Sequence, residues 1–225
     1  MGQIQSAQDG ISAWPVSSAL DTGLRTLRAH DPLIFEGDDA DHLYEVIEGV
    51  IRVYKVFYDG RRQIMAFAFP GDIIGLGQAD IYSFDCDALT FARVRTISKA
   101  DLLRTVRERP ELGAQMLEMA SREITAAQSL SITLCRKSAI ERVASFLCSL
   151  AERRRDIGTS QTLSVPMTRA DIADYLGLTI ETVSRNITKL KSLDVISLPT
   201  PGTVLIHDMK RLKRIGDCEV DTRAA

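Results

Sequence analysis

The chain has 225 residues, 45% of them hydrophobic and 26% charged, and its formal net charge is −2 at pH 7. This composition is typical of a folded protein with a soluble surface, and the length allows two modest cores. The charge is unevenly spread, since the part from Arg136 onward holds 15 Lys and Arg against 11 Asp and Glu, whereas the preceding part is acidic. A mildly basic C-terminal part on an acidic body is consistent with a local nucleic-acid contact.

Several protein classes are excluded by simple patterns. No apolar run approaches the roughly 18 residues that a membrane span needs, and the polar N-terminus shows no signal peptide, so we expect a cytoplasmic protein without a membrane partner. No nucleophile–base pair or glycine-rich phosphate loop is recognisable, and we therefore expect no catalytic residues and no enzyme. The cysteines are scattered without a CxxC pair or a histidine cluster, which argues against a metal site and a disulfide framework. They are Cys86, Cys135, Cys148 and Cys218.

The N-terminal half of the chain follows a β pattern. A polar, loosely held arm, residues 1–21, precedes a predicted β domain at residues 22–109. Glycines recur there every 11 or 12 residues between stretches rich in β-branched and aromatic residues, and Asp59-Gly60 is a strong hairpin signal. Short strands at such regular spacing predict a sandwich, a jelly roll or a barrel. The recurring glycines are Gly37, Gly49, Gly60 and Gly71, and the expected strands are 43–47, 50–57, 64–69 and 89–97.

After the β domain the apolar period becomes helical. A short helix is predicted at residues 100–107, and Pro110 opens a long helical segment that we assign, with a hinge, to residues 110–137. Apolar and small residues step along it by four and three, which predicts a coiled-coil seam in a homodimer. A single buried helix in a monomer would give a similar pattern. The expected interface residues are Leu117, Ala120, Ile124, Ala127 and Leu134, and a second stripe for packing on the β domain holds Leu112, Met116, Met119 and Leu130.

The last segment, residues 138–225, opens with Ser138-x-x-Glu141, a capping-box pattern that predicts the start of a helix. Further on, Thr168 is expected to cap a helix that stops at Gly177, and Thr179 to cap a second helix. Two short helices that are joined through a glycine turn predict a helix-turn-helix.

The helix-turn-helix, residues 168–190, is followed by a predicted hairpin. Its strands are expected at 195–198 and 204–206, around a Pro-Thr-Pro-Gly turn. A helix-turn-helix with such a hairpin is a winged helix. The predicted fold is therefore α+β, with an N-terminal β-roll of jelly-roll type, a long dimerisation helix and a C-terminal winged helix-turn-helix.

The second helix of this motif has a polar face that suits base reading. Arg185 can bond the two acceptors of a guanine with both arms of its fork, and Glu181 can accept from a cytosine amine while it orients Arg185. Ser184 can also bond a base edge, so these three residues are the predicted base contacts. The alternative is an exposed helix whose Glu181 and Arg185 form only an ion pair. The predicted DNA-backbone contacts are Thr168, Thr179, Thr182, Thr188 and Lys189, and the expected buried stripe is Ile180, Val183, Ile187 and Leu190.

The order of β-roll, long helix and winged helix, with Glu181-Thr-Val-Ser-Arg185 in the second helix, resembles the bacterial CRP/FNR regulator superfamily over about residues 31–207. The stretches 171–185 and Asp59-Gly-Arg-Arg-Gln63 are most similar to its FixK branch. The resemblance implies a β-roll of the cyclic-nucleotide-binding-domain type and a homodimeric activator of low-oxygen respiration or nitrogen-fixation genes, with RNA polymerase as partner. It also implies that the Glu-x-x-Ser-Arg pattern reads inverted TTGAT half-sites. Asn186 departs from the family, which usually has an apolar residue there.

The β domain lacks the groups with which cyclic-nucleotide members of this superfamily hold their ligand. Those members use an Arg-Ser pair for the phosphate and a Glu for the ribose, whereas Leu76 stands at the Glu position and the stretch 81–90 contains no basic residue. Asp85 and Asp87 would instead repel an unpaired phosphate. An iron–sulfur cluster needs clustered N-terminal cysteines, and residues 1–85 hold none. We therefore predict no bound cofactor.

Two other functional interpretations stay open. A regulator of the same superfamily could sense nitric oxide or a haem-bound gas, although His30 and His42 are lone histidines of a kind more typical of surface or turn positions. A protein of a different class could use the β-roll as a cyclic-nucleotide-type scaffold without DNA binding, which the complete winged-helix pattern disfavours. Cys86 could be a redox switch, but a lone cysteine in or beside a strand is usually unreactive.

Added cyclic AMP is expected to change neither the DNA affinity nor the thermal stability of the protein. A ligand selective for the folded state adds about 2.7 kcal/mol at 100 times its Kd, so binding would be visible as a higher Tm. The measurement is thermal unfolding with and without micromolar cyclic AMP. A clear rise in Tm would contradict the interpretation of Leu76 and of the stretch 81–90.

Overall fold

The computed structural model describes residues 23–78, 80–155 and 162–218 of the chain. The predicted N-terminal arm, residues 1–21, lies outside the described residues. Within the described ranges, the structure contains no helix that combines the length and the apolar character needed to cross a membrane.

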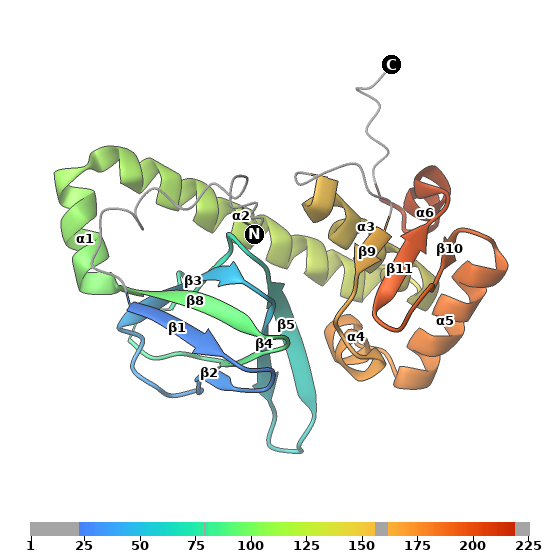
Figure 1. Cartoon of the computed structure of the whole chain (residues 1–225), viewed down its shortest axis with the longest axis horizontal. Helices are drawn as coiled ribbons and strands as arrows, with labels where there is room; N and C mark the ends of the chain where they lie inside the picture. Colours follow the sequence, from blue (N-terminus) through green and yellow to red (C-terminus); the bar gives the residue numbers. More distant parts are fainter. Residues whose placement is uncertain (1–22, 79, 156–161, 219–225) are drawn as a thin grey trace, which may run out of the picture. The chain divides into compact units, whose positions relative to one another are not determined.

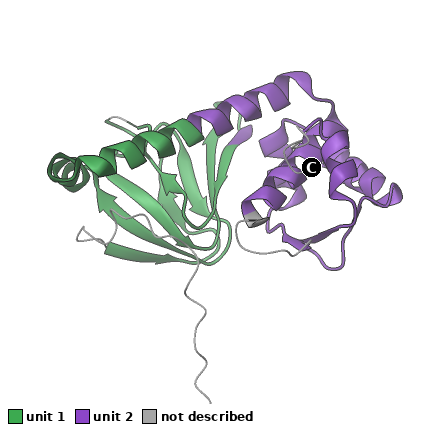
Figure 2. Ribbon diagram, turned by 90° about the horizontal axis from the view of Figure 1, so that it is seen from above, with its two compact units in different colours: residues 1–60, 65–122 green, residues 61–64, 123–225 purple. Residues whose placement is uncertain are grey.

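The chain divides into two compact units. Unit 1 is made of residues 1–60 and 65–122, and Figure 2 shows it in green as a β structure with helices at one end. Unit 2 is made of residues 61–64 and 123–225, and its purple ribbon is mainly helical. The long helix α2, Pro110–Arg136, contributes residues to both units.

Two β-sheets form the roll of unit 1 (Figure 1). One sheet has the strand order β1-β8-β3-β6, and the other has the order β2-β7-β4-β5. Apolar side chains from both sheets, among them Val46, Ile51 and Val94, are buried in one core. The strands are β1 Gly23–Leu27, β2 Pro32–Ile34, β3 His42–Glu48, β4 Ile51–Val56, β5 Arg62–Ala68, β6 Ile73–Ile74, β7 Asp85–Ala88 and β8 Ala92–Ser98.

The predicted β-roll is confirmed, and the long strands are where the sequence places them. The predicted strands at 43–47, 50–57 and 64–69 are β3, β4 and β5, with ends that differ by one or two residues. The strand expected at 89–97 begins later, as β8. The strands β1, β2, β6 and β7 were not predicted, because each has two to five residues and shows too little alternation to be recognised.

The recurring glycines stand at turns that require a positive φ. The φ angles of Gly37, Gly49, Gly60 and Gly71 lie between +81° and +93°. Close packing also requires a glycine at position 49, since a Cβ atom there would lie 2.2 Å from the carbonyl oxygen of Phe91. The spacing of these glycines therefore reports the hairpin corners of the roll.

A short helix, α1 Lys99–Glu108, leads into α2. One stripe of α2 packs on the β-roll: Leu112 is buried with residues of β3, β8 and α1, and Met116 and Met119 pack against the same cluster. These contacts confirm the predicted packing stripe for the part of α2 in unit 1. The other stripe has no such cover, because Leu117 is 70% exposed and Ile124 is 58% exposed.

Unit 2 is a winged helix, as predicted. Its strands form a sheet in the order β10-β11-β9, and α3 packs on both α5 and α6. At the start of α3, the Ser138 N–H donates to the Glu141 carboxylate (2.6 Å), which is one half of the predicted capping box. The elements are α3 Ala139–Arg155, β9 Thr162–Ser164, α4 Arg169–Leu176, α5 Ile180–Ser192, β10 Ile196–Ser197, β11 Thr203–Ile206 and α6 Met209–Ile215.

Arg142 on α3 holds the ends of two other helices. Its Nη1 donates to the carbonyl oxygen of Leu176 at the end of α4 (3.0 Å), and its Nη2 donates to that of Leu134 in α2 (2.8 Å). Its Nε donates to the carbonyl oxygen of Lys137 (2.9 Å). The last carbonyls of a helix have no partner within the helix and carry a partial negative charge, so a guanidinium is well suited to them. Sequence reasoning did not single out this residue.

Replacing Arg142 with methionine is expected to lower the free energy of unfolding by roughly 1.5–3 kcal/mol, because hydrogen bonds to a charged group are lost while the aliphatic stem stays. Equilibrium unfolding in urea measures this change. The control is Arg211→Met, which removes a single bond to the Leu193 carbonyl oxygen (2.9 Å) at an exposed position and should cost less. Equal urea midpoints for the wild type and Arg142→Met would contradict the stabilising role of these hydrogen bonds.

Candidate DNA interface

The helix-turn-helix depends on two helix caps and one glycine turn. The Asp171 N–H donates to the Thr168 hydroxyl oxygen (3.1 Å), and the Thr168 N–H donates to the Asp171 carboxylate (3.0 Å), which confirms the predicted cap of α4. α4 ends at Gly177, whose φ of +60° is in the left-handed region. Thr179 then caps α5 by accepting from the Thr182 N–H (3.2 Å).

The inner side of α5 is buried along most of its length. Val183, Ile187 and Leu190 are at most 4% exposed, as predicted. Ile180 was expected in the same stripe, and this prediction is wrong, because the residue is 49% exposed. It is the first residue of α5, and the stripe is covered only from Val183 onward. Asn186 is half-buried, and its amide donates to a backbone carbonyl one turn earlier (2.8 Å), so its polar group is satisfied within the helix.

The three predicted base-contacting residues lie on the uncovered side of α5. Glu181, Ser184 and Arg185 are all exposed. Within the described part of the chain, no ion pair joins Glu181 and Arg185, and the Arg185 guanidinium makes no hydrogen bond. The pKa of Glu181 is lowered by its own backbone N–H, then by the Thr179 hydroxyl and by the charge of Arg185, so the carboxylate is ionised and can accept hydrogen bonds.

The hydroxyls predicted to contact phosphates are engaged in the fold. Thr168 donates its proton to the Asp171 carboxylate (2.6 Å), and Thr188 donates to a backbone carbonyl of its own helix (3.0 Å). The hydroxyl oxygens of Thr179 and Thr182 lie 3.1 Å apart and share a hydrogen bond. These side chains cap and stabilise the helices, and a phosphate would have to compete for their protons.

Cationic groups beside the helices are the better candidates for phosphate contacts. Lys189 is exposed on α5, and its ammonium has no hydrogen-bond or ion-pair partner among the described residues. Arg169, which sequence reasoning did not select, stands at the first position of α4. There the helix dipole disfavours a positive charge. A cation at a helix N-terminus is unfavourable for the helix itself, and this feature of the sequence could have marked Arg169 as a candidate phosphate contact.

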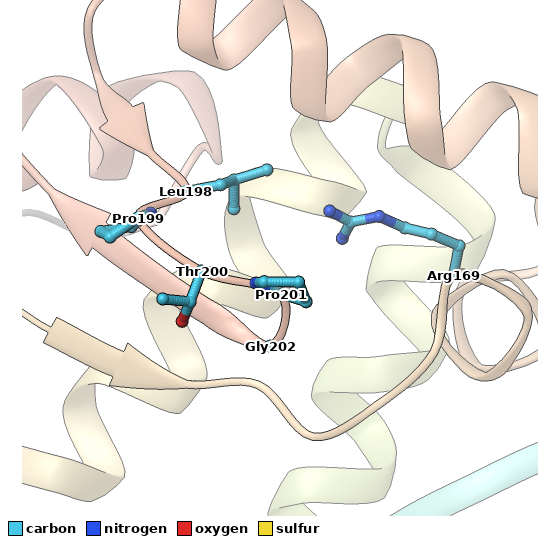
Figure 3. Close-up of a pocket in the computed structure, with 6 residues that line it drawn as sticks. All are labelled: Arg169, Leu198, Pro199, Thr200, Pro201 and Gly202. Atoms are coloured by element: carbon cyan, nitrogen blue, oxygen red, sulfur yellow. The ribbon is translucent and has the colours of Figure 1, made fainter.

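A hollow of about 300 Å³ separates Arg169 from the turn of the wing, residues 198–202. Figure 3 shows the guanidinium of Arg169 pointing toward Leu198 and Pro201 across this space. Burial lowers the pKa of Arg169, and no hydrogen-bond partner for it lies among the described residues. A half-buried guanidinium next to a turn is well placed to bind an anion at the edge of the helix-turn-helix.

In unit 1, the acidic residues of the stretch 81–90 already have partners. The fork of Arg52 binds Asp87, with Nε 2.9 Å from one carboxylate oxygen, and both residues are buried. Asp85 accepts from the Glu36 N–H (3.0 Å). Leu76 packs at the edge of the cluster that anchors α2. The carboxylates of Asp85 and Asp87 therefore already accept hydrogen bonds from other groups of the fold.

The other residues considered as sensors have ordinary environments. His30 and His42 are exposed, as expected for surface or turn residues. Cys86 is buried, and burial raises the pKa of its thiol, so the thiol is protonated and unreactive. Among residues 23–78, 80–155 and 162–218, no group of three or more His, Cys, Asp or Glu could hold a metal ion.

Comparison with known proteins connects both units to described families. The Crp-like helix-turn-helix domain matches residues 141–215, and the cyclic nucleotide-binding domain matches residues 24–109. These ranges contain the winged helix and the β-roll respectively.

Individual relatives agree with this assignment. The transcriptional activatory protein AadR of Rhodopseudomonas palustris is 42% identical over 80% of this chain and 76% of its own length. The nitrogen fixation regulation protein FixK of Bradyrhizobium diazoefficiens is 44% identical over 76% and 73%. The structure of FixK2 from Bradyrhizobium japonicum superposes with a TM-score of 0.82 at 30% identity, over 89% of this chain and all of that one. The chain therefore belongs to the CRP/FNR superfamily of transcription regulators, in its FixK-like branch.

Proposed function

We propose that the protein is a sequence-specific DNA-binding activator of transcription that works as a homodimer in the cytoplasm with RNA polymerase as partner. The carrying observation is α5, whose inner stripe is buried while Glu181, Ser184 and Arg185 stay exposed and available. The names of its relatives, an activatory protein and a nitrogen fixation regulator, support an activator of nitrogen-fixation genes. Control of low-oxygen respiration genes is proposed from the resemblance of residues 171–185 and 59–63 to the FixK branch.

In this proposal the first turns of α5 read base edges in the major groove. The guanidinium of Arg185 matches the O6 and N7 acceptors of the guanine in a TTGAT half-site. Glu181 accepts from a cytosine amine, and its lowered pKa keeps it an acceptor at neutral pH. Ser184 lies between them in the sequence and can bond either a donor or an acceptor.

In the proposed complex, contacts with the DNA phosphates set the affinity for DNA and the register of the protein on the duplex. Lys189 and Arg169 supply charges that have no internal partner in the described chain. The N-termini of α4 and α5, which Thr168 and Thr179 cap, add partial positive charge that favours phosphates there. Thr182 and Thr188 act through the helix geometry that their hydroxyls support.

The proposed dimer forms through the uncovered stripe of α2. Leu117 and Ile124 are large apolar side chains with most of their surface in solvent, and Ala127 is also exposed. Ala120 and Leu134 on the same stripe are half-buried. Large apolar residues that recur in a heptad pattern and stay exposed, such as Leu117 and Ile124, are expected to meet a second copy of the same helix.

Ile124→Asp is expected to disrupt this dimer, because a charged carboxylate in an apolar seam costs several kcal/mol. Sedimentation velocity measures the change in mass. Ala126→Asp is the matched control, since Ala126 is exposed on the opposite side of α2 and its variant should remain dimeric. An unchanged dimer for Ile124→Asp would show that the seam lies elsewhere.

Arg185→Lys is expected to cost ~1–3 kcal/mol per half-site on an inverted TTGAT repeat, because lysine cannot reproduce the planar fork. The loss should be far smaller on a duplex whose guanine is replaced, since that duplex offers no partner to lose. Binding titrations on both duplexes at two salt concentrations measure these effects. Equal weakening on the two duplexes would make Arg185 a phosphate contact and would refute its role in base reading.

Lys189→Ala serves as the control for a contact without sequence information. It should weaken binding to both duplexes about equally and reduce the salt dependence by about one unit per contact. Arg169→Gln should behave in the same way if the hollow beside the wing receives a phosphate. A sequence-dependent loss in either variant would contradict its assignment to the DNA backbone.

A further inference from the structure

The first residues of β5 bind α4, the first helix of the helix-turn-helix. Residues 61–64 belong to unit 2 together with the winged helix, whereas β5 continues from Met65 in unit 1. Arg62 and Gln63 both direct their side chains to α4, which lies 109 to 112 positions further along the chain. Both residues belong to the stretch Asp59-Gly-Arg-Arg-Gln63, to which the base-reading proposal assigns no task.

The guanidinium of Arg62 lies between two carboxylates of α4. Its Nε donates to Asp174 (2.8 Å), and its Nη2 donates to Asp171 (3.0 Å). Asp171 and Asp174 are three positions apart, so both project from the same face of the helix, where their negative charges repel each other. The side chain of Asp171 is only 2% exposed, and a carboxylate so deeply buried requires compensation of its charge. Arg62 supplies a cation to both carboxylates.

One of these carboxylates also closes the cap of α4. One oxygen of Asp171 accepts from Arg62, and the other accepts from the Thr168 N–H (3.0 Å) and the Thr168 hydroxyl (2.6 Å). The orientation of Asp171 is thus shared between the guanidinium and the capping box. Arg62 therefore helps to fix the start of α4.

Gln63 holds the other end of the same helix. Its amide nitrogen donates to the carbonyl oxygen of Asp174 (2.7 Å), in the last turn of α4. Arg142 donates to the carbonyl oxygen of Leu176, two positions further on. Carbonyls in the last turn have no partner within the helix, so these donors satisfy groups that the helix itself leaves open. α4 is therefore bound at its start by Arg62 and at its end by Gln63 and Arg142.

We propose that Arg62 is a positioning residue for base reading, which fixes α4 and thereby the direction of α5. This inference rests on the proposed function, in which α5 enters the major groove. α4 packs on α5, and only the short turn at Gly177 joins them. A displaced α4 would move Arg185 relative to the guanine, and the two-armed geometry of a guanidinium tolerates little displacement.

A cation beside a helix-turn-helix could instead contact a phosphate, and the two roles differ in what they do to binding. Loss of a phosphate contact weakens binding to every duplex and lowers the salt dependence by about one unit. Loss of a positioning residue acts through the bases that α5 reads. It therefore lowers the ratio of the affinities for matched and guanine-substituted duplexes and leaves the salt dependence unchanged.

The first test compares full-length wild type and Arg62→Met, at a temperature at which circular dichroism shows both to be folded. Arg62→Met is expected to bind the inverted TTGAT repeat roughly tenfold more weakly, a size typical of residues that share one ion-pair network. Its affinity for the guanine-substituted duplex should change little. Arg25→Met is the control, because it removes the same charge from an exposed position of β1 and should leave both affinities unchanged.

A milder variant covers the case that Arg62→Met loses too much stability. Asp174→Asn removes one charge of the pair and keeps the contact between Arg62 and Asp171. The side chain of Asp174 is 31% exposed, so the fold should tolerate the change. The ratio of the two affinities should fall in this variant as well, by less than in Arg62→Met. An unchanged ratio in both variants would overturn the proposal.

The second test exchanges the charges. Arg62→Glu and Asp174→Arg should each lower the preference for the TTGAT repeat. The double variant again places one cation beside two carboxylates, and it should recover most of the preference that the single variants lose. A double variant no better than the weaker of the two single variants would show that the ion pair does not position the helix.

The outcomes separate this inference from the function on which it rests. A wild-type protein that binds the TTGAT repeat and the guanine-substituted duplex equally would refute base reading itself, and the role of Arg62 with it. A wild-type protein that distinguishes them, together with Arg62→Met that distinguishes them equally well, would refute the positioning role alone. Equal weakening of Arg62→Met on both duplexes, with a lower salt dependence, would make Arg62 a phosphate contact.

Discussion

The geometry of the DNA-binding unit depends on how one guanidinium joins three helices. Arg142 projects from α3 and binds carbonyl oxygens at the ends of α2 and α4. Those carbonyls have no partner within their helices, and leaving them buried and unpaired would cost more than the net value of an ordinary hydrogen bond. Only three residues, among them Gly177 at the turn, separate the end of α4 from the start of α5. The direction of the recognition helix therefore follows from where Arg142 fixes the end of α4.

Around this turn, the polar side chains fall into two groups, those bonded within the fold and those exposed to solvent. The threonine hydroxyls close helix caps or bond to backbone carbonyls, so they hold the motif in shape. The groups left available on the surface are the charged Glu181, Arg185 and Lys189 and the small polar Ser184. In the proposed function, specificity would rest on the exposed side chains of the first turns of α5, and affinity would rest on cations at the edge of the motif. A helix that spent Arg185 on an internal ion pair could not do both.

The sequence predicts local features of this fold better than distant ones. Thr168, Gly177 and Thr179 are recognisable because caps and glycine turns act within three or four residues of the chain. The hydrogen bond from Arg142 to the Leu176 carbonyl oxygen joins residues 34 positions apart, so no local sequence pattern predicts it. Ile180 matches the helical period, yet it is exposed because it is the first residue of α5. Periodicity does not show which turns of a helix the rest of the unit covers.

In the β-roll, the charge of Asp87 is compensated by a cation of the same fold. From the sequence, Asp85 and Asp87 are repulsive to a cyclic phosphate. In the structure Asp87 is bound by the buried fork of Arg52, so its charge is compensated. Binding a phosphate through Arg52 would require this pair to separate, which leaves a buried carboxylate without its cation. Breaking a buried pair in this way typically costs about 3–5 kcal/mol, so the expected lack of phosphate binding rests for Asp87 on an internal ion pair and not on simple repulsion.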